Sequence, residues 1–215
     1  MSVTGKAALG LAALALAGGA GLAAASPAGA TTTACGAPCM TWSNQDFGTG
    51  YVMAVAGGLP VIGAPERLSA TADSAAEDWA ETDAGNLTDL AAQGRVSPEA
   101  ATLYQGMEGY EFQFAPNGVA SGLCFGLATA AHAGGRVTLR RCGVSSRTIW
   151  IGNIAFQRGR FVPVVPGSDT STTFDHSLVL TASATGRALT VNQASISDTG
   201  MASSQMWQTL WGALS

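Results

Sequence analysis

The sequence predicts an all-β domain in which three hairpin repeats close around one hydrophobic core. Each repeat consists of two short strands of alternating apolar residues, a turn rich in small residues, and a tryptophan that follows a polar residue. The repeats span residues 50–79, 122–150 and 177–207. A unit of about forty residues does not bury its apolar face alone, so the three units must share one core.

Each repeat ends in one of three indoles, those of Trp79, Trp150 and Trp207. Strands rich in glycine, alanine and threonine offer little apolar area, whereas one indole contributes about 150–250 Å². We expect the polar residue before each indole to hold the preceding turn by a side-chain hydrogen bond. In the third repeat this residue is Gln205, in the first it is Glu77, and in the second Arg147 lies three places before the tryptophan.

The second repeat has the most specific pattern. Within Ser121–Asn153, Gly-Leu-Cys-x-x-Leu is followed by Gly-Arg-Val-Thr-Leu-Arg-Arg-Cys and then by Trp150. This segment resembles one repeat of the ricin-type β-trefoil lectins. The resemblance extends from Gly50 to Trp207 and implies a β-trefoil fold with a carbohydrate ligand. The alternative is an unrelated β-sandwich, in which the tryptophans are ordinary core or surface residues.

The sugar-binding acid of the ricin-type family lies two residues after the first cysteine of a repeat. Here that position is Gly126, the first repeat offers Ala54, and the third offers Thr190 or Asn192. Because no repeat has the acid, the resemblance implies that the ordinary sugar site is absent. We expect any sugar contact to come from Asn192 with Gln193, and the alternative for Asn192 is a role in a turn.

Residues 1–30 have the pattern of a secretory signal peptide. Lys6 is followed by an apolar run, Ala7–Ala25, and then by small residues up to Ala30. We expect cleavage after Ala30, which leaves residues 31–215 as a secreted, extracellular domain. A weakly hydrophobic membrane anchor is the alternative.

Four cysteines in an exported chain predict disulfide bonds. Three pairings are open, and the pairing of near neighbours joins Cys35 to Cys39 and Cys124 to Cys142. A metal or redox role for the first pair is the alternative. Since neither of the two histidines has metal-ligand spacing to a cysteine, we expect no metal and no cofactor.

The segment between the first and second repeats has helix signals in place of strand signals. Gly94 suits the end of one helix, and Ser97 before Pro98 suits the start of the next. We predict an insertion at about residues 83–108, with its helices within Asn86–Leu103.

Charge and motifs argue against several functions. The chain has 10 Lys and Arg against 14 Asp and Glu. Its arginines are scattered apart from Arg140–Arg141 and Arg158–Arg160, which we assign to solvated strand ends, so no basic face for nucleic acid or an anionic membrane is visible. It has neither a Gly-x-Ser-x-Gly nor a His-Glu-x-x-His motif, so we expect no enzyme activity. We assign four acids to a solvated rim: Glu66, Asp73, Glu77 and Asp78.

The sequence therefore predicts a secreted, non-catalytic binding protein with a diverged carbohydrate-binding β-trefoil. The alternative is an extracellular protein-interaction or protease-inhibitor-like trefoil that uses its inserted loops. The ligand, the partner and the oligomeric state stay open.

Overall fold

The computed structural model describes residues 39–72, 74–143, 145–152 and 159–211. The predicted signal peptide and Cys35 lie outside these ranges, so neither signal cleavage nor the Cys35–Cys39 bridge is described. The described residues belong to one compact unit. No helix within the described ranges is long and apolar enough to cross a membrane.

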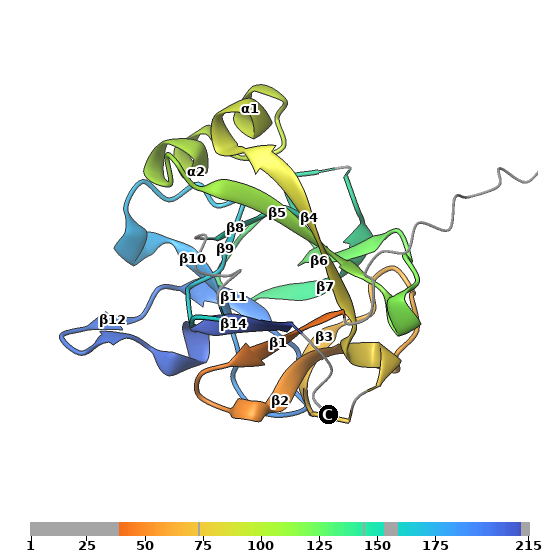
Figure 1. Ribbon diagram of the computed structural model, residues 1–215. Coiled ribbons are helices and arrows are strands. Elements are labelled where there is room, and N and C mark those ends of the chain that lie inside the picture. The colour runs from red at the N-terminus through yellow and green to blue at the C-terminus, as the bar shows by residue number, and fades with distance from the viewer. Residues whose placement is uncertain (1–38, 73, 144, 153–158, 212–215) are drawn as a thin grey trace, which may run out of the picture. The chain divides into compact units, whose positions relative to one another are not determined.

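The chain is mostly β-structure, with two short helices between the fourth and fifth strands (Figure 1). The strands are β1 Met40–Asn44, β2 Gly48–Val55, β3 Glu66–Ala70, β4 Trp79–Asn86, β5 Glu108–Phe114, β6 Leu123–Leu127, β7 Gly135–Arg141, β8 Trp150–Gly152, β9 Val165–Pro166, β10 Leu178–Thr181, β11 Thr190–Gln193, β12 Ile196–Ser197, β13 Gly200–Met201 and β14 Trp207–Trp211. The helices are α1 Leu87–Ala92 and α2 Pro98–Leu103.

Six strands close into an antiparallel barrel, in the order β1, β4, β5, β8, β9 and β14. A bridge between Val162 and Trp207 links the segment before β9 to the start of β14. Strand β14 then pairs with β1 along its whole length, which completes the circle. A closed barrel removes the free edges that an open sheet would leave for association with other chains.

Three further hairpins, β2–β3, β6–β7 and β10–β11, form what we call the hairpin cap. Each hairpin touches the next in a ring. Pro65, just before β3, bridges to Thr138 of β7; β7 pairs with β11; and Ala188, before β11, bridges to Arg67 of β3. A six-stranded barrel with three hairpins in a ring is the β-trefoil architecture, so the predicted fold is confirmed.

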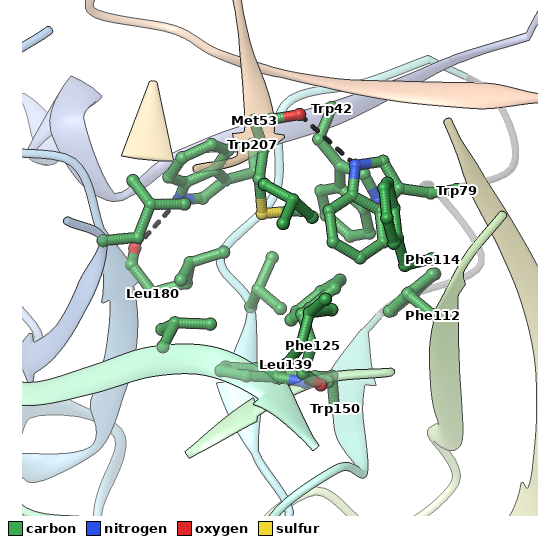
Figure 2. Close-up of a cluster of buried hydrophobic side chains, with 14 of the residues drawn as sticks. Trp42, Met53, Trp79, Phe112, Phe114, Phe125, Leu139, Trp150, Leu180 and Trp207 are labelled. Carbon is green, nitrogen blue, oxygen red and sulfur yellow. Dashed lines mark hydrogen bonds between the residues drawn. The ribbon is translucent and has the colours of Figure 1, made fainter. Parts of the chain in front are cut away.

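The three predicted tryptophans converge in the core (Figure 2). All three are fully buried. Counted with its barrel strands, each repeat has four main strands: β1–β4, β5–β8, and β9, β10, β11 and β14. Each indole N–H donates to a backbone carbonyl in the second of these strands: Trp79 to Met53 at 3.3 Å, Trp150 to Phe125 at 2.9 Å and Trp207 to Leu180 at 2.9 Å. The repeated bond places the three indoles in equivalent positions.

The ring of Phe125 joins the first two repeats in the core. Its centroid lies 5.4 Å from that of Trp79 and 4.9 Å from that of Trp150. It also lies 5.5 Å from the centroid of Trp42, an indole of β1 that the sequence analysis did not assign to a repeat. Offset and edge-on aromatic pairs of this kind add about 0.5–1.5 kcal/mol each beyond their buried area.

The helical insertion covers the outside of the barrel and encloses a second apolar cluster. Leu87, Leu90 and Ala100 of the helices pack there with outward-facing residues of the barrel and of the hairpin cap, such as Ile151 and Val179. This arrangement follows from strand alternation, since the neighbours of inward-facing core residues point away from the barrel.

Local signals set the helix boundaries, and those at Gly94 and Ser97 are the ones predicted. The side chain of Asn86 accepts from the Thr88 N–H at 2.8 Å, and that of Ser97 accepts from the Ala100 N–H at 3.0 Å. Gly94 has φ of 70°, which glycine adopts without strain at a helix end.

A disulfide joins Cys124 to Cys142 across the open end of the β6–β7 hairpin, with a sequence separation of 18. Cys39 is also in a disulfide. The third repeat has an extra hairpin, β12–β13, between its third and fourth strands. This short ribbon was not predicted, and its two strands pair only with each other.

Candidate functional site

The indole hydrogen bonds show where the sugar-binding acid of ricin-type domains would lie. The carbonyl acceptors are on Met53, Phe125 and Leu180. The equivalent acid positions are therefore the next residues, Ala54, Gly126 and Thr181. For the third repeat this corrects the sequence assignment, because Thr190 and Asn192 lie on the following strand, β11.

The Gly126 position is closed to any side chain. A Cβ atom added there would lie 2.6 Å from the backbone oxygen of Arg147 and 3.0 Å from the Thr148 methyl group. The Arg147 oxygen is held in place because it accepts from the Leu127 N–H at 2.9 Å. The glycine is thus required by close backbone packing, and the second repeat has no room for a sugar-binding acid.

The other two positions also lack a free carboxylate. Ala54 is buried. The Thr181 hydroxyl donates to the Val179 carbonyl at 2.9 Å and accepts from the Gln205 side chain at 3.3 Å. None of the three repeats therefore offers the acid that ricin-type sugar sites use.

Asn192 and Gln193, the predicted sugar contacts, lie on β11 and face different neighbours. Asn192 is half-buried; its side-chain oxygen accepts from the Gly134 N–H at 3.2 Å, and its nitrogen donates to the Thr190 hydroxyl at 2.9 Å. Gln193 is exposed and donates to the Asp175 carbonyl at 3.2 Å. Asn192 thus holds the β6–β7 turn against β11, as its alternative role in a turn suggested, and the residue remains partly exposed.

The polar residue two places before each indole is buried and holds a turn. Gln205 accepts from the Ser195 N–H at 2.7 Å and donates to the Gln193 carbonyl at 2.9 Å. Glu77 accepts from the Ala72 N–H at 3.1 Å, so it belongs to the interior and not to the solvated rim expected for it.

In the second repeat this role belongs to Thr148, not to Arg147. Thr148 is fully buried and its hydroxyl donates to Glu111 at 2.5 Å. Glu111 also accepts from the Gly143 N–H at 2.7 Å, and its other oxygen lies 3.5 Å from the Arg95 guanidinium. Since Arg95 lies between α1 and α2, this network ties the helical insertion to the barrel.

Two further buried polar groups stand out. Tyr104, just after α2, donates to the Ser177 hydroxyl at 2.6 Å, and burial raises the pKa of its phenol to about 12. Glu66 is completely buried and neither of its carboxyl oxygens has a hydrogen-bond partner. Burial raises the pKa of Glu66 well above its usual value. The expectation that Glu66 belongs to a solvated rim was therefore wrong.

The two histidines of the chain both lie at the surface. His132 is exposed in the β6–β7 turn, where its Nδ1 lies 3.0 Å from the Ala130 carbonyl oxygen. His176 and Asp175 are 3.9 Å apart, and both side chains are about two-thirds exposed. Among the described residues no group of three or more His, Cys, Asp or Glu side chains is arranged to hold a metal ion.

An apolar pocket of about 370 Å³ lies between the end of α2 and the barrel. Its lining includes Leu103, Tyr104, Met107, Ile151 and Phe174. One wall ends at Gly152, beyond which residues 153–158 are outside the described part of the chain. The pocket suits an aliphatic or aromatic group better than a sugar, because its walls offer few hydrogen-bonding atoms.

Comparison with known proteins places the chain by fold alone. No family model matches the sequence, and no curated protein matches it. The structure is similar to ThreeFoil, a designed protein with threefold symmetry, at 14% identity and a TM-score of 0.53, over 80% of this chain and 96% of that one. It is also similar to part of a mosquitocidal holotoxin, at 14% identity and a TM-score of 0.52, over 79% of this chain. This chain spans 16% of the toxin's length.

Proposed function

We propose that this protein is an exported, non-catalytic binding domain, a diverged ricin-type trefoil whose ligand class is carbohydrate. The observation that carries the proposal is the pattern of the third repeat. It keeps the Gln205-x-Trp207 order and carries a partly exposed amide residue, Asn192, on its third strand, β11. Amide groups of this kind donate to and accept from sugar hydroxyls.

The surroundings of Asn192 support a small polar recognition surface. The Thr190 hydroxyl lies next to it, and the exposed turn that carries His132 is fixed against it through Gly134. These groups offer donors and acceptors on a rigid strand and a tight turn, which reduces the entropy lost on binding. Since none of the three acid positions carries a carboxylate, we expect weaker and differently oriented sugar binding than a complete ricin-type site would give.

A glycan array probed with residues 31–215 tests the proposal. This segment contains the whole described barrel and cap, and it omits the predicted signal. We expect at least one glycan to bind, N192A to abolish that binding, and Q105A, which alters an exposed amide just after α2, to leave it unchanged. An array without any bound glycan would refute the carbohydrate assignment.

The pocket beside α2 favours a second candidate, binding of an extracellular protein through the inserted elements. A single apolar side chain of a partner would fill such a pocket, as anchor residues do at protein interfaces. Capture of a partner from culture supernatant should then be lost in M107E, which charges the pocket. The same kind of substitution in M201E, on β13 and outside the pocket, should leave the capture of the partner unchanged. Equal capture by both variants would exclude the pocket as the interface.

A further inference from the structure

The hairpin cap has a charge that is opposite to that of the whole protein. Residues 48–70, 123–141 and 178–193, which make up its hairpins, contain five arginines and a single acid, Glu66. That acid is completely buried. The arginines of the cap are Arg67, Arg136, Arg140, Arg141 and Arg187. The other 13 of the 14 acids therefore lie outside these segments.

Strand alternation turns several of these arginines to the outer face of the cap. Val137 and Leu139 of β7 are in the core, so Arg136 and Arg140 point outward. By the same alternation Leu68 points inward and its neighbour on β3, Arg67, points outward.

The ring of hairpins then brings the arginines of different repeats together. Arg67 bridges to Ala188, the residue after Arg187, and Arg136 pairs with Thr190 two residues further along. Four of the five side chains are exposed and Arg140 is half-buried. Among the described residues none of the five forms an ion pair with a carboxylate.

An apolar ridge borders this basic face. Leu59, Val61 and Ile62, in the loop between β2 and β3, are 65%, 57% and 48% exposed. The loop is fixed against β7, because the Gly63 N–H donates to the Leu139 carbonyl at 2.8 Å and the Leu139 N–H donates to the Ala64 carbonyl at 2.9 Å. The three aliphatic side chains thus stand on an ordered loop that runs beside Arg140.

We propose that the outer face of the hairpin cap docks on an anionic lipid membrane. The aliphatic ridge would enter the boundary between headgroups and acyl chains, and the arginines would contact the lipid phosphates and carboxylates. Apolar side chains next to unpaired basic residues are the composition of surfaces that bind at this boundary. Because the face is positively charged, we expect it to bind an anionic bilayer more tightly than a neutral one. The proposal does not depend on the sugar ligand.

Flotation of residues 31–215 with lipid vesicles tests the proposal. We expect binding to phosphatidylcholine vesicles that contain phosphatidylserine, little binding to pure phosphatidylcholine, and weaker binding as salt is raised. No binding to either vesicle, or equal binding to both, would overturn it. Capture of an acidic protein by the same face, without any vesicle binding, would also overturn it.

A triple arginine variant tests the electrostatic part. R67Q/R140Q/R187Q should weaken binding roughly 100-fold, since each arginine near an anionic surface contributes about fivefold. The control R160Q removes an exposed arginine outside the cap and should leave binding unchanged. Unfolding midpoints of the variants check that the fold is retained. A folded triple variant that binds as tightly as the wild type would overturn the proposal.

A loop variant tests the apolar part. L59S/V61S/I62S should reduce binding by roughly tenfold or more, because it removes the side chains that enter the boundary region. The matched control V119S/I196S changes two aliphatic residues outside the hairpin cap, which are 55% and 49% exposed. Equal binding by the two variants would show that the ridge does not contact the membrane.

Discussion

Replacing Glu66 with leucine should stabilise the protein, although the change removes a charged residue type. In the β2–β3 register Glu66 lies opposite Val55, as Val137 lies opposite Leu127 in the second hairpin. Leu189 has the matching place in the third, and backbone hydrogen bonds link all three: Leu189 N–H to the Glu66 carbonyl and Val137 N–H to the Leu189 carbonyl. One of three equivalent core positions thus holds a carboxyl group, and the other two hold aliphatic side chains.

The size of the effect follows from the unpaired oxygens. A buried polar group without a partner costs about 1–3 kcal/mol, and an aliphatic side chain of similar volume adds apolar burial. We therefore expect E66L to raise the free energy of unfolding by about 2–4 kcal/mol at neutral pH. For a domain of this size the midpoint of thermal unfolding should rise by roughly 5–10 °C.

The raised pKa of Glu66 also predicts a pH dependence. Below the usual pKa of 4.5 the carboxyl group of Glu66 is protonated in both the folded and the unfolded chain, and its contribution to the stability is largest. As pH rises above that value only the unfolded chain releases the proton. The contribution of Glu66 to the stability therefore falls, by at most about 1.4 kcal/mol per pH unit. The fall ends once pH passes the raised pKa of the folded state.

Urea unfolding of the wild type, E66L and E66Q across this pH range measures both effects. E66L and E66Q should both lose this contribution to the pH dependence, and only E66L should gain stability, because glutamine keeps an unpaired buried amide. If E66L is less stable than the wild type, or if its stability falls with pH as steeply, the assignment of an unpaired protonated carboxyl group is wrong.

Three further changes test the fold and the closed sugar position. W150F should lower the free energy of unfolding by about 2–4 kcal/mol, measured in urea, because it removes a buried hydrogen-bond donor and leaves a cavity. One hydrogen bond alone contributes about 0.5–1.5 kcal/mol, so a loss below about 1 kcal/mol would contradict the place of Trp150 in the core. C124A/C142A should cost about 3 kcal/mol by the same assay, from the loop that the disulfide closes; an unchanged midpoint would argue against it. G126D should destabilise strongly and gain no glycan on an array, since the Arg147 backbone fills the space; a stable, sugar-binding variant would refute the packing argument.

The parts of the fold that the sequence predicted are those carried by local signals. Trp79, Trp150 and Trp207 follow turn patterns, and the helix signals at Gly94 and Ser97 act within one helical turn. Such features depend on neighbours in the sequence. They could be predicted without knowledge of how the repeats meet.

The parts that were missed depend on register and on contacts between repeats. The acid position of the third repeat was placed on β11, because the unequal loop lengths hide that Thr181 of β10 is the true equivalent. Glu66 was assigned to the surface by its residue type, although its strand position turns it inward. The basic face was invisible in the sequence because residues as distant as Arg67 and Arg187 meet only through the ring of hairpins.

Hydrogen exchange of the indole N–H groups, followed by nuclear magnetic resonance, tests the central claim most directly. The claim is that three equivalent tryptophans donate to the second strands of their own repeats in one shared core. The N–H signals of Trp79, Trp150 and Trp207, assigned by single substitutions to phenylalanine, should exchange at one common slow rate set by global unfolding. Fast exchange of any one of the three, independent of global unfolding, would contradict the claim.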